Sequence, residues 1–273
     1  MGGFCLSGKT AVIVGGGGVL GAAMAKGLAA AGARVAVVDL NGDAACRAVE
    51  EIARGGGEAR AWQADAMRAA ELEACREEIR SAWGAPDVLL SAVGGNIREA
   101  TASDEVAFFD LPLPALERVV GLNLFAGAII PAQVFGRAMA EKPCGASIIN
   151  ISSMNGFRPL TRVAGYSAAK AAVSNFTQWL AVYVAQNFNP RVRVNAIAPG
   201  FFLTEQNRYL LTDRATGGLT DRGRAILAHT PMGRFGAPED LAGAAVWLAS
   251  EASAFVTGAV IPIDGGFSAF SGV

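Results

Sequence analysis

A tyrosine and a lysine stand four residues apart in the segment Tyr166-Ser-Ala-Ala-Lys170, and Ser153 lies thirteen residues upstream of the tyrosine. Residues at a spacing of four share one face of a helix, so the lysine charge can lie beside the phenol. A nearby cation favours the phenolate and should lower the phenol pKa from its usual value of about 10. Such a phenol, with a serine hydroxyl bound to the same oxygen, can exchange a proton with a carbonyl or an alcohol.

A glycine-rich stretch, Val14-Gly-Gly-Gly-Gly-Val-Leu-Gly21, joins the first expected strand to the first expected helix. Glycines let the backbone approach a phosphate closely, and the helix N-terminus offers unpaired N–H groups to the anion. Asp39 ends the next expected strand, where a carboxylate can bind the ribose hydroxyls of NAD and would repel the extra phosphate of NADP. No Arg or Lys lies within the turn or just after Asp39, so we expect NAD rather than NADP. The alternatives are a flexible turn and a solvated acid.

The elements that must position these residues alternate along the chain. Short β-branched runs predict strands at 10–14, 34–39, 58–62, 87–91, 146–151, 192–197 and 259–263. Helical patterns lie between them at 19–31, 42–53, 68–83, 113–140, 166–187 and 238–249. This alternation predicts an α/β fold, a Rossmann-type doubly wound parallel sheet in three α/β/α layers, as a single domain over residues 1–273.

Composition excludes several classes of function. The chain has 273 residues, of which 52% are hydrophobic and 17% charged, with a net charge of -1. This predicts a sizeable core and no binding to nucleic acid or to a membrane. One histidine and four cysteines without a CxxC pair predict no metal site and reduced thiols. With no signal-like N-terminus, we expect a cytoplasmic protein.

Two irregular stretches follow expected strands, at 94–114 and at 201–235. Both lie after the carboxyl ends of strands, where open α/β sheets bind ligands. A long irregular insertion in a compact domain is usually functional, so the second stretch is expected to form a substrate lid.

The order of the motifs resembles the short-chain dehydrogenase/reductase family along essentially the whole chain. It runs from the glycine turn through Asp39, Asn123, Ser153 and Tyr166 to Lys170. The resemblance implies that Tyr166 carries the proton and that Lys170 lowers its pKa and binds the nicotinamide ribose. It also implies that Ser153 polarises the substrate carbonyl and that Asn123 holds a water linking Lys170 to solvent.

The resemblance further implies a set of cofactor contacts, with Asp65 near the adenine. They are Gly15, Gly18, Val19, Leu20, Gly21, Asp39, Asp65, Ala66, Gly94, Tyr166, Lys170, Pro199, Gly200, Phe202 and Thr204. Two departures leave the local geometry open. Val19 replaces the middle glycine of the family turn, and Ser91-Ala-Val-Gly94 replaces the family's Asn-Asn-Ala-Gly.

Five blocks are similar to one subgroup, the D-mannonate oxidoreductases of short-chain type, also called fructuronate reductases. The blocks are 15–21, 151–160, 175–180, 199–208 and 228–235. This similarity implies hydride transfer between NAD and a sugar acid, D-mannonate or D-fructuronate. The alternatives are another polyol, sugar-acid or 3-oxoacyl reductase of the family and, in a different class, an NAD-binding regulator without turnover.

A sugar acid needs a cation for its carboxylate, preferably a guanidinium. Arg158 is the first candidate, Arg208 the second and Arg162 the third, each with a solvated surface role as the alternative. Asn155 is expected to bind a sugar hydroxyl. His229, the only histidine, is either a substrate contact or a hydrogen-bonded structural residue.

The family resemblance also implies a homotetramer. Its interfaces are expected to use the long helices that start near Leu113 and Tyr166, with the strand at 258–262 and the tail at 267–273 as further contributors.

Overall fold

Seven parallel strands form one sheet in the computed structural model, which describes residues 2–204, 208, 211–213 and 217–272. Their order across the sheet is β3-β2-β1-β4-β5-β6-β7. The strands are β1 Thr10–Val14, β2 Arg34–Asp39, β3 Ala59–Gln63, β4 Val88–Ser91, β5 Ser147–Ile151, β6 Arg193–Pro199 and β7 Val260–Ile263. The predicted doubly wound parallel sheet is therefore confirmed, with every strand end within two residues of its expected place.

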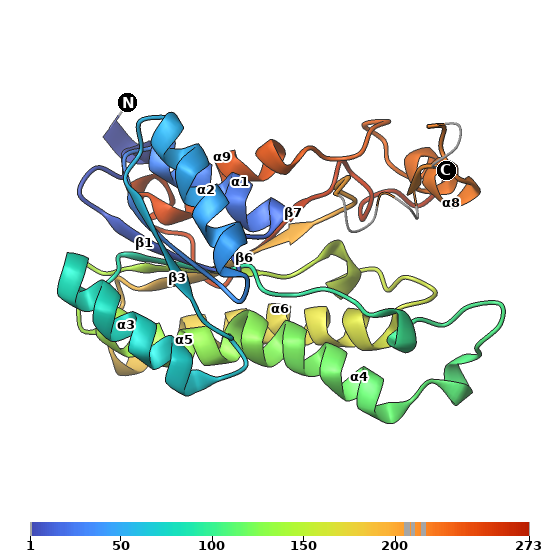
Figure 1. Ribbon diagram of the computed structural model, residues 1–273, viewed down its shortest axis with the longest axis horizontal. Helices are drawn as coiled ribbons and strands as arrows, with labels where there is room; N and C mark the ends of the chain where they lie inside the picture. The colour runs from blue at the N-terminus through green and yellow to red at the C-terminus, as the bar shows by residue number, and fades with distance from the viewer. Residues whose placement is uncertain (1, 205–207, 209–210, 214–216, 273) are drawn as a thin grey trace.

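Helices cover both faces of the sheet and make three layers (Figure 1). One face carries α1 (Val19–Ala30), α2 (Gly42–Arg54) and α9 (Ala242–Ala249). The opposite face carries α3 (Ala69–Trp83), α5 (Ile130–Ala140) and α6 (Ala164–Asn187). Single-turn helices are η1 Gly2–Phe4, η2 Arg98–Ala100, η3 Phe108–Asp110, η5 Met154–Gly156, η6 Pro238–Leu241 and η7 Glu251–Ser253.

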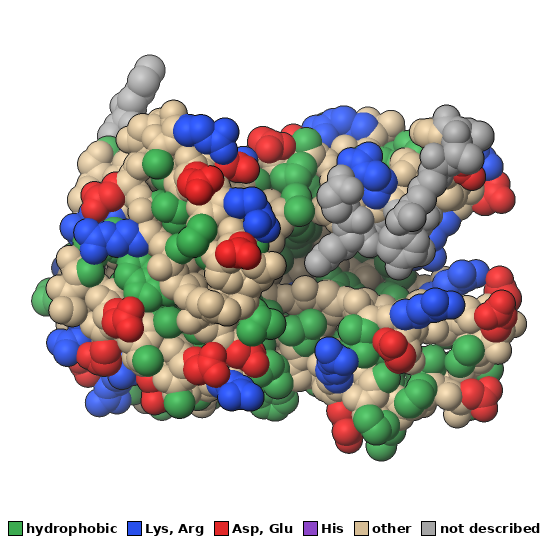
Figure 2. Space-filling model, viewed as in Figure 1, with side chains coloured by type: hydrophobic (Ala, Val, Ile, Leu, Met, Phe, Trp, Pro, Cys, Tyr) green, Lys and Arg blue, Asp and Glu red, His purple; other side chains and the backbone are tan. Residues whose placement is uncertain are grey.

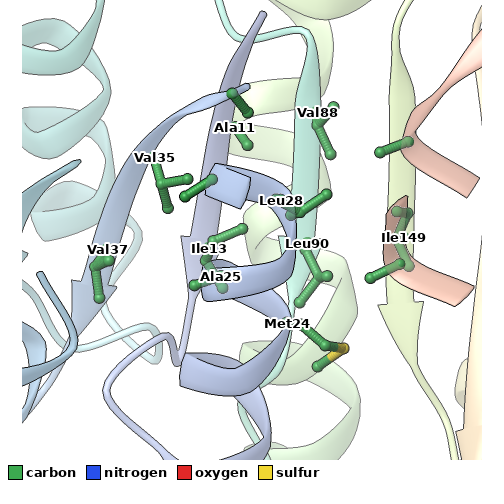
Figure 3. Packing of buried hydrophobic residues seen from close by; sticks show 14 of the residues in the cluster. Ala11, Ile13, Met24, Ala25, Leu28, Val35, Val37, Val88, Leu90 and Ile149 are labelled. Atoms are coloured by element: carbon green, nitrogen blue, oxygen red, sulfur yellow. The ribbon is translucent and has the colours of Figure 1, made fainter. Parts of the chain in front are cut away.

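The central strands are buried along their whole length because helices lie on both sides of them. All five residues of β1 and all four of β4 are buried, as expected for parallel strands rich in β-branched side chains. Figure 3 shows Met24 and Leu28 of α1 packed against the side chains that β1, β2, β4 and β5 send to this face. This packing fixes the start of α1 against the end of β1.

The expected helix 113–140 is continuous but not regular. It consists of α4 (Leu113–Val120), a π-helical segment η4 (Gly121–Ile129) and α5. The predicted helix at 113–140 is therefore confirmed, with a π-helical segment in its middle that was not predicted. The wider turns bring the helix close to the chain after β4, where a Cβ on Gly127 would lie 2.6 Å from the Val93 carbonyl oxygen.

By length and composition, Leu113–Ala140 could also cross a membrane, and half of its most apolar window is buried inside the structure. It packs against α3 and α6, and a core helix of a soluble protein passes the same test.

The expected lid, 201–235, contains some regular structure. Phe202 forms a parallel bridge with Gly236, and Thr212 forms an antiparallel bridge with Leu219. The helix α8 (Asp221–Ala228) follows, and the Thr220 hydroxyl accepts a hydrogen bond from the Gly223 amide at 3.0 Å. Residues 205–207, 209–210 and 214–216 of the expected lid lie outside the described residues.

Candidate active site

The strand order changes direction at β1, because β2 and β3 lie on one side of this strand and β4 to β7 lie on the other. A cleft lies at the carboxyl ends of β1 and β4, where the order changes. The cleft measures about 390 Å³. In Figure 2 the surface is hollowed on the right, between the part that carries α8 and the part that carries α4. Its lining consists of Gly15, Gly17, Gly18, Val19, Leu20, Gly21, Ala92, Gly94, Gly95, Ile151, Ser152, Ser153, Tyr166, Lys170, Pro199, Gly200, Phe202 and Thr204.

The glycine turn has the shape of a phosphate cradle. Gly15 has φ 82°, and a Cβ there would lie 2.8 Å from the Val93 amide nitrogen. A Cβ on Gly21 would clash with the Gly15 carbonyl oxygen. Gly18 caps α1 without any side-chain hydrogen bond, so the first N–H groups of the helix are open to an anion.

Val19 is compatible with this turn. It is the first residue of α1, it is 44% exposed and it lines the cleft. Among the described residues every positive φ belongs to a glycine. The departure from the family pattern at Val19 therefore requires no strained backbone.

Asp39 lies at the end of β2 and is held by two backbone amides. Its Oδ2 accepts from Gly17 at 2.9 Å and its Oδ1 accepts from Asn41 at 2.9 Å. Each carboxylate oxygen keeps a further lone pair for a ligand hydroxyl. Asp65, after β3, accepts from the Met67 amide at 2.9 Å. Asp39 ends β2, and Asp65 and Ala66 follow β3. None of the three residues lines the cleft.

Tyr166 and Lys170 lie on consecutive turns at the start of α6, as predicted. The Lys170 Nζ lies 5.7 Å from the centroid of the Tyr166 ring and donates to the Ile151 carbonyl at 2.8 Å. Ser153 follows β5 and caps η5, where its Oγ accepts from the Asn155 amide at 3.2 Å. The structure therefore brings all three side chains to one side of the cleft.

The pKa of Tyr166 does not shift as predicted. Burial raises it, and a hydrogen bond with Ser153 opposes this rise only in part. The Lys170 Nζ lies over the face of the Tyr166 ring. Burial also lowers the pKa of Lys170 to about 7. Desolvation of the phenol is therefore the larger effect on the Tyr166 pKa.

Asn123 lies in the π-helical segment and is fully buried. Its amide group donates to the Gly95 and Val119 carbonyls at 2.6 and 2.8 Å, and its Oδ1 accepts from the Gly95 amide at 3.0 Å. A Cβ on Gly94 would lie 2.7 Å from this Oδ1 and 3.0 Å from the Lys170 Nζ. Asn123 thus fixes the turn after β4 directly beside Lys170, and its water-holding role stays a prediction.

Of the expected substrate residues, Ser153 lines the cleft, whereas Asn155 and the three candidate arginines lie outside its lining. Arg158 follows η5, is exposed, and its Nε donates to the Ser268 carbonyl at 3.2 Å. Arg162 is paired with Asp104 at 3.4 Å. Arg208 is exposed, and its backbone amide bonds to the Thr204 carbonyl.

Asn155 and His229 differ in their surroundings. Asn155 is 5% exposed, and its Oδ1 has no hydrogen-bond partner among the described residues. An unpaired buried amide oxygen is costly unless a ligand or water satisfies it. His229 ends α8, and its Nδ1–H donates to the Ala225 carbonyl at 3.0 Å, which favours the structural interpretation.

Sequence reasoning missed part of the lining, namely Gly17, Ala92, Gly95, Ile151 and Ser152. Ser152 has a clear role because its hydroxyl donates to the Lys170 carbonyl at 2.9 Å and bonds to Ser174 at 2.7 Å. Its position directly before Ser153 was the available signal.

Comparisons with known proteins agree with this geometry. Residues 18–268 match the family model described as enoyl-(acyl carrier protein) reductase. An uncharacterized oxidoreductase from Haemophilus influenzae is 46% identical over 279 residues, which are 98% of this chain and 96% of that protein.

Two solved structures are also similar. A proposed D-mannonate oxidoreductase from Haemophilus influenzae with bound NAD has a TM-score of 0.91 at 45% identity, and the match covers 98% of both chains. A proposed 2-deoxy-D-gluconate 3-dehydrogenase from Agrobacterium tumefaciens with bound NADP has a TM-score of 0.83 at 32% identity, covering 99% of this chain and 100% of that one.

Proposed function

Because the chain belongs to the short-chain dehydrogenase/reductase family, whose members are NAD(P)-dependent oxidoreductases acting on CH–OH groups, we propose that it transfers a hydride between NAD and a sugar acid. D-mannonate and D-fructuronate are the proposed substrate pair. The observation that carries the proposal is the convergence of Ser153, Tyr166 and Lys170 on the cleft that begins at the phosphate cradle.

The residues present fit a dinucleotide. The open start of α1 and the close approach at Gly15 suit a pyrophosphate, and the Asp39 carboxylate suits ribose hydroxyls while it disfavours an added phosphate. When bound, the nicotinamide supplies the hydride acceptor or donor. NAD in the similar Haemophilus influenzae structure supports this choice, and NADP in the Agrobacterium tumefaciens structure keeps NADP possible within the family.

The side chains handle the proton. The raised pKa keeps the Tyr166 phenol protonated. In the reducing direction this phenol donates its proton to the substrate carbonyl oxygen. The Ser153 hydroxyl donates a hydrogen bond to the same oxygen and stabilises its developing charge. Lys170 is positioned by the Ile151 carbonyl to bond the nicotinamide ribose. In the oxidising direction Tyr166 takes the proton of the substrate hydroxyl.

The acid part of the substrate is assigned to η5 (Met154–Gly156) and the residues that follow it. Asn155 offers its unpaired Oδ1 to a sugar hydroxyl, and Arg158 offers a guanidinium to the carboxylate. Arg208 is the second candidate for this contact. The similarity to the proposed D-mannonate oxidoreductase supports the substrate class.

A substrate panel tests the proposal. Hexonates and ketohexonates are assayed with NAD(H) and NADP(H) separately, beside neutral hexitols of the same length. We expect turnover of mannonate with NAD and weaker turnover with NADP. Activity on hexitols but on no acid would refute the sugar-acid assignment.

The same assay tests the proton carrier. The Tyr166→Phe variant should lose about 10²- to 10⁴-fold in kcat, the usual contribution of a positioned acid or base. Tyr183→Phe is the matched control because Tyr183 lies on the same helix, away from the cleft. Near-normal turnover by Tyr166→Phe would show that another group carries the proton.

A further inference from the structure

The segment after β7 folds back over the open end of the sheet. The Asp264 carboxylate accepts hydrogen bonds from the backbone amides of Gly266 and Ser268, both at 2.9 Å. Gly265 and Gly266 have φ values of 64° and 89°, which glycine adopts without strain. The Gly265 carbonyl also accepts from the Met232 amide at 3.1 Å. The chain is therefore held in a defined turn, and we call residues 264–270 the strap.

The strap contacts two segments of the lid region through its aromatic rings. Phe267 lies against Phe201 with ring centroids 5.2 Å apart, and against His229 at 6.4 Å. Phe270 lies against the same His229 at 6.2 Å. Phe201 directly precedes Phe202, which lines the cleft. The strap thus ties the end of α8 to the segment that leaves β6.

The other side of the strap contacts the loop after the catalytic serine. The Ser268 carbonyl accepts the hydrogen bond from the Arg158 Nε. The Arg158 backbone amide in turn bonds to the Met154 carbonyl at 3.0 Å, one turn after Ser153. With Nε held in this way, neither Nη of Arg158 has a partner among the described residues. The terminal edge of the guanidinium, formed by the two Nη groups, can still pair with a carboxylate through two parallel hydrogen bonds.

We propose that the strap is a specificity element, which holds Arg158 through the Ser268 carbonyl so that its guanidinium can bind the carboxylate of the substrate. This inference rests on the proposed sugar-acid function and adds a positioning role for Phe267 and Phe270. A long, exposed arginine loses much side-chain entropy when it is fixed. A fixed backbone acceptor reduces that loss before the substrate binds, as preorganisation generally does.

Charge around the strap is consistent with an anionic ligand. The one carboxylate within the strap, that of Asp264, already accepts two backbone amides. Arg162, the nearest alternative in sequence, is paired with Asp104 and is therefore less available. Arg158 is consequently the better placed of the two for a new ion pair.

A double-mutant cycle tests the proposal with mannonate and the matched hexitol as probes. Arg158→Ala should lower the preference in kcat/KM for the acid over the hexitol by roughly ten- to a hundred-fold, the range for hydrogen bonds between charged groups. Phe267→Ala should lower the same preference by about three-fold or more, through KM for the acid. In the Arg158→Ala background, Phe267→Ala should have no further effect on the preference, since Arg158 is the group that the strap positions.

Phe255→Ala is the matched control because Phe255 is a fully exposed phenylalanine outside the strap, and it should leave the preference unchanged. Where Phe267→Ala unfolds the protein, Phe270→Ala removes only the outer ring and gives the same comparison. An unchanged preference in the strap variants, or an equal loss in the Arg158→Ala background, would overturn the role of the strap alone. A wild-type protein that turns over hexitols but no acid would overturn the proposed function, and the strap proposal with it.

Discussion

Burial sets the charge of Lys170 more strongly than its neighbours do. The side chain is 3% exposed, and its pKa falls to about 7 from an ordinary value of 10.5. Its one direct hydrogen bond goes to the Ile151 carbonyl. The lysine can therefore lose its proton near neutral pH, which an exposed lysine does not do.

The lowered pKa makes a prediction about stability. Below pH 7 both the folded and the unfolded protein carry the charge, and the folded protein bears the full desolvation cost. Between pH 7 and 10.5 the unfolded state binds more protons, so the free energy of unfolding should rise with pH. Lys170→Met removes this cost. The gain in the free energy of unfolding of this variant over wild type should therefore be largest at or below pH 7.

Urea unfolding at pH 6.5, 8 and 9.5 measures the effect. The difference in the free energy of unfolding between Lys170→Met and wild type should change by up to about 1.4 kcal/mol per pH unit above pH 7. Lys26→Met is the control because the Lys26 side chain is partly exposed and forms an ion pair with Glu51 at the surface, and its curve should run parallel to that of wild type. A parallel curve for Lys170→Met would contradict the lowered pKa.

At the scale of single residues, the sequence predicts which side chains lie close together better than it predicts their pKa values. Spacing and motif order were sufficient to bring Ser153, Tyr166 and Lys170 together. The pKa of Tyr166 was predicted in the wrong direction because desolvation depends on packing that no local pattern contains. The bond between Arg158 and Ser268 joins residues 110 positions apart, so it could not be predicted from spacing.

The glycine turn and α1 act as one element, and the tightest point in this element is Gly21. A Cβ there would meet the Gly15 carbonyl, so Gly21→Ala should push the first turn of α1 away from β1. We expect a loss of about 1–3 kcal/mol in stability, typical of overpacking. We also expect at least a ten-fold rise in KM for NAD, because the N–H groups move from the phosphates.

Gly243→Ala is the control for this prediction. Gly243 lies in α9 with open space around its Cα, so alanine should stabilise the helix by about 0.5–1 kcal/mol. Thermal unfolding and cofactor titration distinguish the two variants. Normal NAD binding by Gly21→Ala would show that the turn is not the phosphate site.

The elements themselves were largely predictable. Buried β-branched runs such as 10–14 and 34–39 are distinctive, and each was found as a strand. The π-helical segment at Gly121–Ile129 was not predicted, because an apolar stretch looks alike whether its turns contain 3.6 or more residues. The 3₁₀ start at Pro238–Leu241 was missed for a related reason, since helix-start signals do not distinguish the two helix types.

At the scale of the whole molecule, an apolar groove runs between α5 and α6. Trp179 is 56% exposed and stacks on Tyr183 at 4.9 Å and on Phe176 at 6.2 Å. Exposed aromatic clusters of this kind mark contact surfaces. The family resemblance implies a homotetramer that uses this helix, so we expect the groove to be covered by a second copy.

Trp179→Glu should therefore lower the molar mass in solution, because a charge in an apolar interface remains unpaired. Light scattering coupled to gel filtration measures the mass. Leu40→Glu, at a similarly exposed apolar residue outside the groove, should leave the mass unchanged. An unchanged mass for Trp179→Glu would place the contact elsewhere.

The strand order has a consequence for how the enzyme is made. After β4, which lies beside β1, each new strand is added beside the previous one, so this side of the sheet extends in the order of synthesis. The phosphate cradle after β1 is complete early, Tyr166 and Lys170 come after β5, and the 199–204 segment comes after α6. A nascent chain therefore contains the segment that holds the phosphates before it contains the residues that handle the proton and the nicotinamide end.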